Sequence, residues 1–186
     1  MIEGIKAALD YPHDARRLRL VSFMTDGYIG NESEILAAIK PRLGRTRIFS
    51  FGVGSSVNRY LLDRMAKLGN GAVAYIGLSD NPADAVDAFY DRICHPALTD
   101  ITIDWGGLQV SDVYPLTLPD LFVGRPVILT GRFSGHLPLN IKLTGHVGDS
   151  YRDLTMSVVD DVIPSAHSGI SYIWARKKIE DLAMCA

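Results

Sequence analysis

Three short apolar runs constrain the fold most strongly, because each ends close to a glycine and is separated from the next by a helical pattern. The runs are Leu18–Met24, Ile48–Val53 and Ala72–Ile76. Nearly continuous apolar runs of this length are typical of strands buried on both faces of a parallel sheet. The first run, Leu18–Met24, therefore predicts a strand in the middle of such a sheet.

Helical patterns alternate with these runs, with apolar side chains recurring every three or four residues. The third pattern stops at Gly69, a residue type that often follows the last turn of a helix. The fourth begins at Asn81-Pro82, where a proline at the first helical position loses no hydrogen bond. The expected helices are Ile2–Leu9, Glu32–Leu43, Asn58–Leu68 and Ala83–Ile93. This alternation predicts an α/β fold with a partial doubly wound parallel sheet of three strands.

The pattern changes after His95-Pro96, where the proline disfavours continuation of the helix. Apolar and polar residues alternate in Thr99–Asp104, and glycine, proline and asparagine separate the later candidates. Those later strand candidates are Val127–Phe133, Leu139–Thr144 and Leu154–Val158. Short strands with such turns predict a small antiparallel β-sandwich or barrel. The last stretch, Ile170–Met184, returns to helical spacing, with Arg176-Lys177-Lys178 expected on its outer face.

The predicted organisation is therefore an α/β part at residues 1–95, a β-sandwich-like domain at 96–169 and a helical segment at 170–186. No earlier strand is available to pair with the far edge of Leu18–Met24, so we expect an excised piece of a longer protein. Unpaired backbone groups on that edge predict a homodimer through the sheet edge or, less readily, coverage by the Ile2–Leu9 helix.

Composition excludes several classes of function. The net charge of −2 argues against nucleic-acid binding, which usually needs a strongly basic face. No apolar run reaches the roughly 18 residues of a membrane-spanning helix. The cysteines, Cys94 and Cys185, are too few and too far apart for a disulfide framework or a zinc knuckle.

Asp26, in Thr25-Asp26-Gly27, is the best candidate for chemistry, because it follows a buried strand at the sheet edge where such folds place ligands. Its carboxylate suits Mg²⁺, general-base catalysis or the capping of the loop before the next helix. These three interpretations remain open from the triplet alone.

Other motifs favour structural roles. Gly52-Val53-Gly54 follows a strand, but the third glycine and the acidic residue of a dinucleotide loop are missing. The histidines lack zinc-site spacing, and no acidic residue completes a triad around Ser165–Ser168. Asp160-Asp161 is typical of a solvated acidic turn.

The motifs taken in order resemble the second half of a von Willebrand factor A domain. The resemblance begins with Met24–Gly27, Gly30–Glu32 and Ile48–Gly54. It is closest to A domains of the inter-α-trypsin inhibitor heavy-chain type, as found in bacterial proteins that add an N-terminal VIT domain. It continues through Asn58–Leu62, Met65, Ala66, Leu98–Ile101, Asp104–Gly107, Tyr114, Pro115, Leu118–Phe122 and Trp174–Ile179. It thus covers essentially the whole chain and makes residues 1–95 the C-terminal half of the A domain.

The resemblance implies a non-enzymatic protein-binding or adhesion protein at or outside the cell envelope. In that family a metal-ion-dependent adhesion site holds Mg²⁺ or a similar cation, and a carboxylate of the protein ligand completes it. Asp26 is the only match to the family's metal ligands, since the Asp-x-Ser-x-Ser motif is absent and Thr25 is not the family's threonine. We therefore expect a divalent cation in the full-length parent and none in this chain. The alternatives are a structural module that braces an A domain, and a doubly wound enzyme that uses Asp26.

Overall fold

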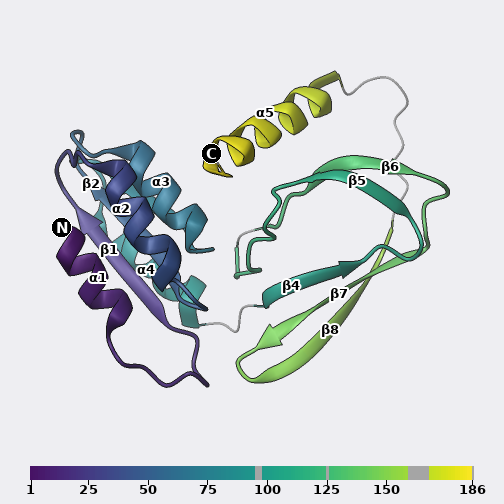
Figure 1. The fold of residues 1–186 in the computed structure, drawn as a ribbon, viewed down its shortest axis with the longest axis horizontal. Coiled ribbons are helices and arrows are strands. Elements are labelled where there is room, and N and C mark those ends of the chain that lie inside the picture. The colour runs from purple at the N-terminus through teal and green to yellow at the C-terminus, as the bar shows by residue number, and fades with distance from the viewer. Residues whose placement is uncertain (95–97, 125, 159–167, 186) are drawn as a thin grey trace. The chain divides into compact units, whose positions relative to one another are not determined.

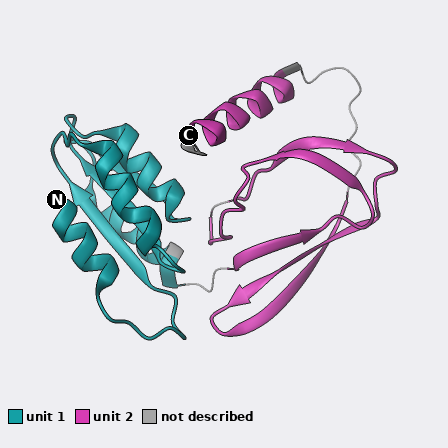
Figure 2. Cartoon of the chain, viewed as in Figure 1, with its two compact units in different colours: residues 1–95 teal, residues 96–186 magenta. Residues whose placement is uncertain are grey.

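The first unit of the chain, Met1–His95, is built on a parallel sheet in the order β1–β2–β3 (Figures 1 and 2). The chain is described by a computed structural model at residues 1–94, 98–124, 126–158 and 168–185. The strands are β1 (Leu20–Thr25), β2 (Arg47–Val53) and β3 (Val73–Ile76). The predicted three-stranded parallel sheet with helices is confirmed.

The helices of this unit follow the predicted order: α1 (Ile2–Asp10), α2 (Glu32–Ile39), α3 (Arg59–Leu68) and α4 (Pro82–Cys94). The expected Glu32–Leu43 helix instead ends at Ile39 and continues as the short 3₁₀ helix η1 (Lys40–Arg42). Pro41 explains the change, because its nitrogen cannot donate the next helical hydrogen bond. None of the helices in the described ranges is long and apolar enough to cross a membrane.

The core of the unit lies on one face of the sheet, where Ile48 of β2 packs with apolar side chains of α1, α2 and α3. Those side chains are Ile5, Leu9, Ile35, Ile39, Leu61 and Met65. On the opposite face, Phe89 of α4 contacts Phe49 and Phe51 edge to face, at centroid distances of 5.2 and 5.1 Å. Helices on both faces of a parallel sheet define the doubly wound class.

The expectation that the first strand is buried on both faces in mid-sheet is wrong for the described chain. β1 is an edge strand, whereas six of the seven residues of β2 are buried. Exposure alternates along β1, and Met24 is 68% exposed. Val21 and Phe23 pack against the core on one face of the strand, whereas Ser22 and Met24 on the other face are exposed.

Two glycines of this unit are required by close approach rather than by turn conformation. Gly69 ends α3 as predicted, but its φ is −85°, so it does not need left-handed backbone. A Cβ at this position would lie 2.6 Å from the Cβ of Ile48. At Gly71, a Cβ would overlap the carbonyl oxygen of Ile48. Both residues therefore let the end of α3 pass directly over β2.

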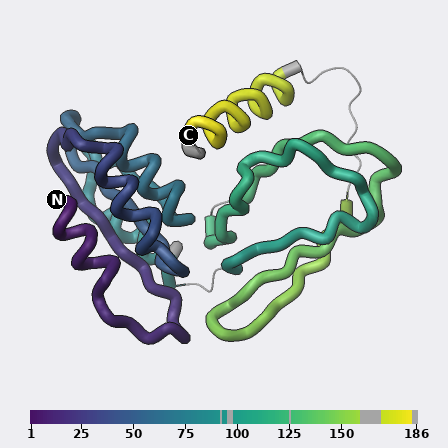
Figure 3. Tube along the Cα trace, viewed as in Figure 1, coloured from purple at the N-terminus to yellow at the C-terminus, as the bar shows by residue number. Residues whose placement is uncertain are grey.

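The second unit, Pro96–Ala186, contains two antiparallel sheets and a helix. One sheet has the order β4–β7–β8, with β4 (Thr99–Asp104), β7 (Asn140–Val147) and β8 (Ser150–Ser157). The tube in Figure 3 shows the tight reversal that joins the last two of these strands. The other sheet pairs β5 (Gln109–Tyr114) with β6 (Thr130–Ser134). The helix is α5 (Ser168–Cys185).

Strand β5 was missed by the sequence patterns. Its alternation breaks at Ser111-Asp112, and Asp112 has a positive φ of 51° where the pairing with β6 shifts register. Such a bulge removes the period-two signal on which strand prediction depends.

The basic face predicted for the last helix is only partly correct. Of Arg176, Lys177 and Lys178, only Arg176 is exposed, and Lys178 pairs with Asp112 at 3.3 Å.

Several positions considered in the sequence lie outside the described residues. They are the His95-Pro96 junction, Asp160-Asp161, and the Ser165–His167 part of the serine-rich segment.

Candidate functional site

The carboxyl ends of the three parallel strands gather the candidate residues of the first unit at one edge of the sheet. Thr25 at the end of β1 lies beside Gly52, and Val53 at the end of β2 lies beside Ile76 at the end of β3. The loop that contains Asp26 and the loop that contains Asp80 therefore leave the sheet from the same edge. Ligands of doubly wound folds bind at this edge.

Asp26 is exposed in the loop after β1, and its carboxylate accepts no hydrogen bond from the part of the chain that the structure describes. The loop is turned by its neighbour Thr25, whose Oγ1 accepts a hydrogen bond from the Gly27 nitrogen at 3.4 Å. The N-cap of α2 is Asn31, so Asp26 does not cap that helix. The carboxylate is thus available to a ligand outside these residues.

Asn58 links the loop that carries Asp26 to the start of α3 through hydrogen bonds. Its Nδ2 donates to the Ile29 carbonyl oxygen at 2.8 Å and to Glu32 Oε1 at 2.6 Å. Its Oδ1 accepts a hydrogen bond from the Leu61 nitrogen at 3.1 Å, which caps the helix. Asn58 is only 6% exposed, so these three contacts fill a buried position. The loop is therefore held at both ends, by β1 and by Asn58.

The electrostatics of this contact favour the charged form of Glu32. Hydrogen bonds from its own backbone nitrogen, from Asn58 and from Tyr28 lower the pKa of the Glu32 carboxyl, against a smaller opposing effect of burial. The sequence suggested Asn58 only as the start of a helix. A buried asparagine at an N-cap could have signalled a second role, but its partner Glu32 lies 26 residues away in the chain.

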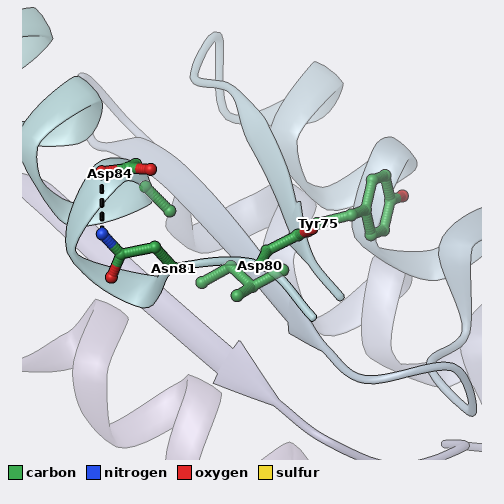
Figure 4. Close-up of a pocket in the computed structure, with 6 residues that line it drawn as sticks. Tyr75, Asp80, Asn81 and Asp84 are labelled. Carbon is green, nitrogen blue, oxygen red and sulfur yellow. Dashed lines mark hydrogen bonds between the residues drawn. The ribbon is translucent and has the colours of Figure 1, made fainter. Parts of the chain in front are cut away.

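A cavity of about 370 Å³ lies at the end of β3 and the start of α4 (Figure 4). It is lined by Tyr75, Ile76, Asp80, Asn81, Asp84 and Ala85. Asp80 Oδ2 accepts a hydrogen bond from the Gly77 nitrogen at 2.7 Å, and Asn81 Nδ2 donates to Asp84 Oδ1 at 3.0 Å. The Asp80 carboxylate therefore stabilises a backbone turn, and the Asp84 carboxylate pairs with the Asn81 side chain at the start of α4.

Tyr75, on the wall of the cavity, is tied to α3. Its hydroxyl donates to Asp63 Oδ1 at 2.9 Å, and the guanidinium carbon of Arg59 lies 4.1 Å from the centre of its ring. Burial and the hydrogen bond to Asp63 raise the pKa of the phenol. These contacts join the end of β3 to α3.

The described residues contain no group of three or more histidine, cysteine, aspartate or glutamate residues placed to hold an ion. Mg²⁺ needs near-octahedral coordination by oxygen, and Asp26 supplies one carboxylate.

Comparisons with known proteins point to von Willebrand factor A domains. No protein-family model matches the chain. The chain is 29% identical, over 114 residues, to a von Willebrand factor A domain-containing protein of Dictyostelium discoideum, covering 61% of this chain and 6% of that protein. It is 24% identical over 127 residues to von Willebrand factor A domain-containing protein 5B1 of Mus musculus, a match that covers 67% of this chain and 10% of that protein. It is 28% identical over 131 residues to protein mono-ADP-ribosyltransferase PARP4 of Homo sapiens, a match that covers 67% of this chain and 7% of that protein.

Among solved structures, the chain matches von Willebrand factor type A from Catenulispora acidiphila at 13% identity and a TM-score of 0.42. That match covers 86% of this chain and 46% of the other. The chain spans a tenth or less of the length of the three curated relatives. The chain is thus similar to a region of von Willebrand factor A domain proteins.

Proposed function

We propose that this chain is part of a protein-binding module of von Willebrand factor A type, in which Asp26 lies at the recognition edge. The observation that carries the proposal is the exposed Asp26 carboxylate, which accepts no hydrogen bond within the described residues and sits at the ligand-binding edge of a doubly wound sheet. The similarity to von Willebrand factor A domain-containing proteins supports it. The more specific form of the same proposal is adhesion outside the cell. The protein would then belong to the inter-α-trypsin inhibitor heavy-chain class and carry a VIT domain.

We further propose that Asp26 contributes one ligand to a Mg²⁺ site in a longer protein and that this chain alone binds no divalent cation. One carboxylate cannot replace the hydration of Mg²⁺, and the described residues offer no further cluster. A protein ligand would then supply a carboxylate of its own, as the resemblance implies.

Two other functions predict different behaviour. A purely structural module would leave partner binding unaffected by any change at Asp26. An enzyme would need a second reactive group beside Asp26, and the carboxylates of the neighbouring cavity are already bonded to local backbone and to Asn81. The transferase activity in the name of PARP4 is a property of that protein.

The metal proposal is tested by calorimetry. Titration of Mg²⁺ or Mn²⁺ into this chain should give no saturable heat. Binding tighter than about millimolar, lost on Asp26→Ala, would contradict the proposal.

Protein binding is tested in a longer protein that contains this chain. The probe is an array of immobilised peptides, each with a Glu or Asp beside a matched peptide with Gln or Asn. Binding to the acidic members in Mg²⁺ should be lost with a chelator and with Asp26→Asn, and kept with Asp84→Asn as the matched control. Equal binding to both peptide sets, or binding unaffected by Asp26→Asn, would overturn the proposal.

A further inference from the structure

The loops that lead into β1 and β2 lie at the amino ends of these strands, at the edge of the sheet opposite the candidate recognition edge (Figure 1). The Arg47 nitrogen donates to the Arg19 carbonyl oxygen at 2.8 Å, which places the two loops side by side. Arg42 Nε of one loop also donates to Asp10 Oδ2 of the other at 3.2 Å. The two loops, with the adjoining ends of helices and strands, are residues 10–19 and 40–47.

This edge of the sheet is strongly basic. Its two segments contain seven arginine or lysine residues and two aspartates, so their net charge is +5. The whole chain carries −2, so all other residues together carry −7. The seven basic residues are Arg16, Arg17, Arg19, Lys40, Arg42, Arg45 and Arg47, and the two aspartates are Asp10 and Asp14. Positive charge is therefore concentrated at one edge of an acidic chain.

Four of the basic side chains are exposed, and we call them the amino-edge patch: Arg16, Arg17, Lys40 and Arg45. Arg19 instead binds the Tyr11 carbonyl oxygen at 2.8 Å, and Arg47 is only 3% exposed. Two exposed carboxylates, Asp10 and Asp14, lie beside the patch. Two negative charges do not neutralise four positive ones, so the surface keeps an excess of positive charge.

One contact within the patch indicates the kind of anion that fits it. Arg16 Nε and Nη2 donate to the two oxygens of Asp14, at 3.1 and 3.0 Å. This two-point geometry is typical of arginine with a carboxylate. Six of the seven basic residues of the two segments are arginine, whose planar guanidinium suits such pairing. The chemistry of the patch therefore favours carboxylates.

The small extent of the patch limits the length of its occupant. A long polyanion such as a nucleic acid would continue past the patch, over a chain whose other residues carry −7, and would be repelled there. A short run of glutamate or aspartate side chains can lie on the patch alone. The matching occupant is a short acidic segment of a protein.

We propose that the amino-edge patch binds a short segment of a partner protein that is rich in glutamate or aspartate, without a metal ion. The loops at the opposite edge carry acidic residues instead, which are Asp26, Glu32, Glu34, Asp80 and Asp84. An acidic segment would be repelled at that edge unless a cation were present. Binding at the amino-edge patch is therefore independent of the function proposed for Asp26.

The probe for this binding is a fluorescein-labelled peptide of alternating glutamate and glycine, with a matched peptide in which glutamine replaces glutamate. Fluorescence anisotropy with the whole chain should show binding of the glutamate peptide that is tighter by about tenfold or more. A chelator and Asp26→Asn should leave it unchanged. A rise in NaCl from about 0.05 to about 0.5 M should weaken it by about tenfold or more, because salt screens exposed charges.

Three outcomes of this titration would overturn the proposal. They are no binding of the glutamate peptide, equal binding of both peptides, and equally tight binding of an oligonucleotide of the same charge. A peptide with a single carboxylate, as in the test of Asp26, offers too few contacts for the patch, so the two surfaces are measured separately.

Matched charge reversals locate the binding. Arg17→Glu combined with Lys40→Glu should weaken binding of the glutamate peptide by about tenfold or more. Arg152→Glu combined with Arg176→Glu changes the net charge equally, at exposed positions of the second unit, and should change binding by less than about twofold. Circular dichroism should show the same secondary structure in both variants.

Equal losses in the two double variants would overturn the proposal, because binding would then follow the net charge and not the patch. Self-association of the wild-type chain that only the first double variant abolishes would also overturn it, because the occupant would then be a second copy.

Discussion

Asn58 Nδ2 donates to Glu32 Oε1 across 2.6 Å and joins the loop before α2 to the start of α3. The two residues lie 26 positions apart in the chain. The same amide also binds the Ile29 carbonyl oxygen, so one buried side chain fixes the path of the loop that begins at Asp26. The placement of the candidate recognition residue therefore depends on a residue of a different helix.

Removal of this contact should destabilise the first unit. Asn58→Ala deletes a helix cap and removes the hydrogen bonds that Asn58 donates to the Ile29 carbonyl oxygen and to the Glu32 carboxylate. We expect a decrease of about 2–3 kcal/mol in the free energy of unfolding, measured by urea denaturation. Asn81→Ala, which removes an exposed cap contact with the Ala83 nitrogen at 3.2 Å, is the control, with an expected decrease of about 1 kcal/mol. A larger effect at Asn81 than at Asn58 would contradict this.

The pH dependence of Glu32 follows from the same contact. Its pKa in the folded chain is lowered from an ordinary value of 4.5, so the folded state binds the proton less readily than the unfolded state. Its contribution to stability is therefore present above about pH 4.5 and is lost as the pH falls through the lowered pKa. Carboxyl NMR titration should give a midpoint for Glu32 below 4.5 in the wild type and a higher one in Asn58→Ala. An unchanged midpoint in the variant would refute the role of Asn58.

Two glycine-to-alanine substitutions should have opposite effects. Gly71→Ala places a Cβ against the carbonyl oxygen of Ile48, a backbone atom that cannot move aside without disturbing β2. We expect a loss of about 2–4 kcal/mol. Gly4→Ala, in α1 with no atom within 4 Å of the new Cβ, should stabilise the chain by about 0.5–1 kcal/mol. Thermal unfolding should show a lower melting temperature for Gly71→Ala and a higher one for Gly4→Ala. A Gly71→Ala chain as stable as the wild type would refute the close-packing argument.

The free edge of β1 is the basis for a prediction about self-association. The strand carries no charged residue or proline of the kind that protects edge strands, and α1 packs beside α2 through Ile5 and Leu9. We expect a dimer at micromolar concentration by sedimentation velocity, formed through this edge. Ser22→Lys in β1 should dissociate it, whereas Thr155→Lys in the exposed edge strand β8 should not. A wild-type monomer whose β1 amides still resist hydrogen exchange would rule out the dimer.

Local patterns were sufficient for most of the fold. The three parallel strands, the helices between them and the change to antiparallel strands after residue 98 all follow from periodicity and from glycine and proline positions. These signals are local, because a helix or strand repeats its burial pattern along a few consecutive residues. Asp26 could also be singled out, since the end of a parallel strand is a position defined by the sequence alone.

Tertiary structure decided the features that depend on distant partners. Whether β1 is central or at an edge depends on which strands and helices lie beside it, and Leu20–Thr25 has the same composition in either case. The bulge at Asp112 hid β5, and the contact of Asp112 with Trp174 and Lys178 in turn fixed which face of α5 is docked and which stays exposed. The hydrogen bond between Asn58 and Glu32 could not be predicted from the sequence pattern around either residue. A sequence specifies the periodicity of each element directly, but pairings between elements arise only when the chain is folded and their side chains meet.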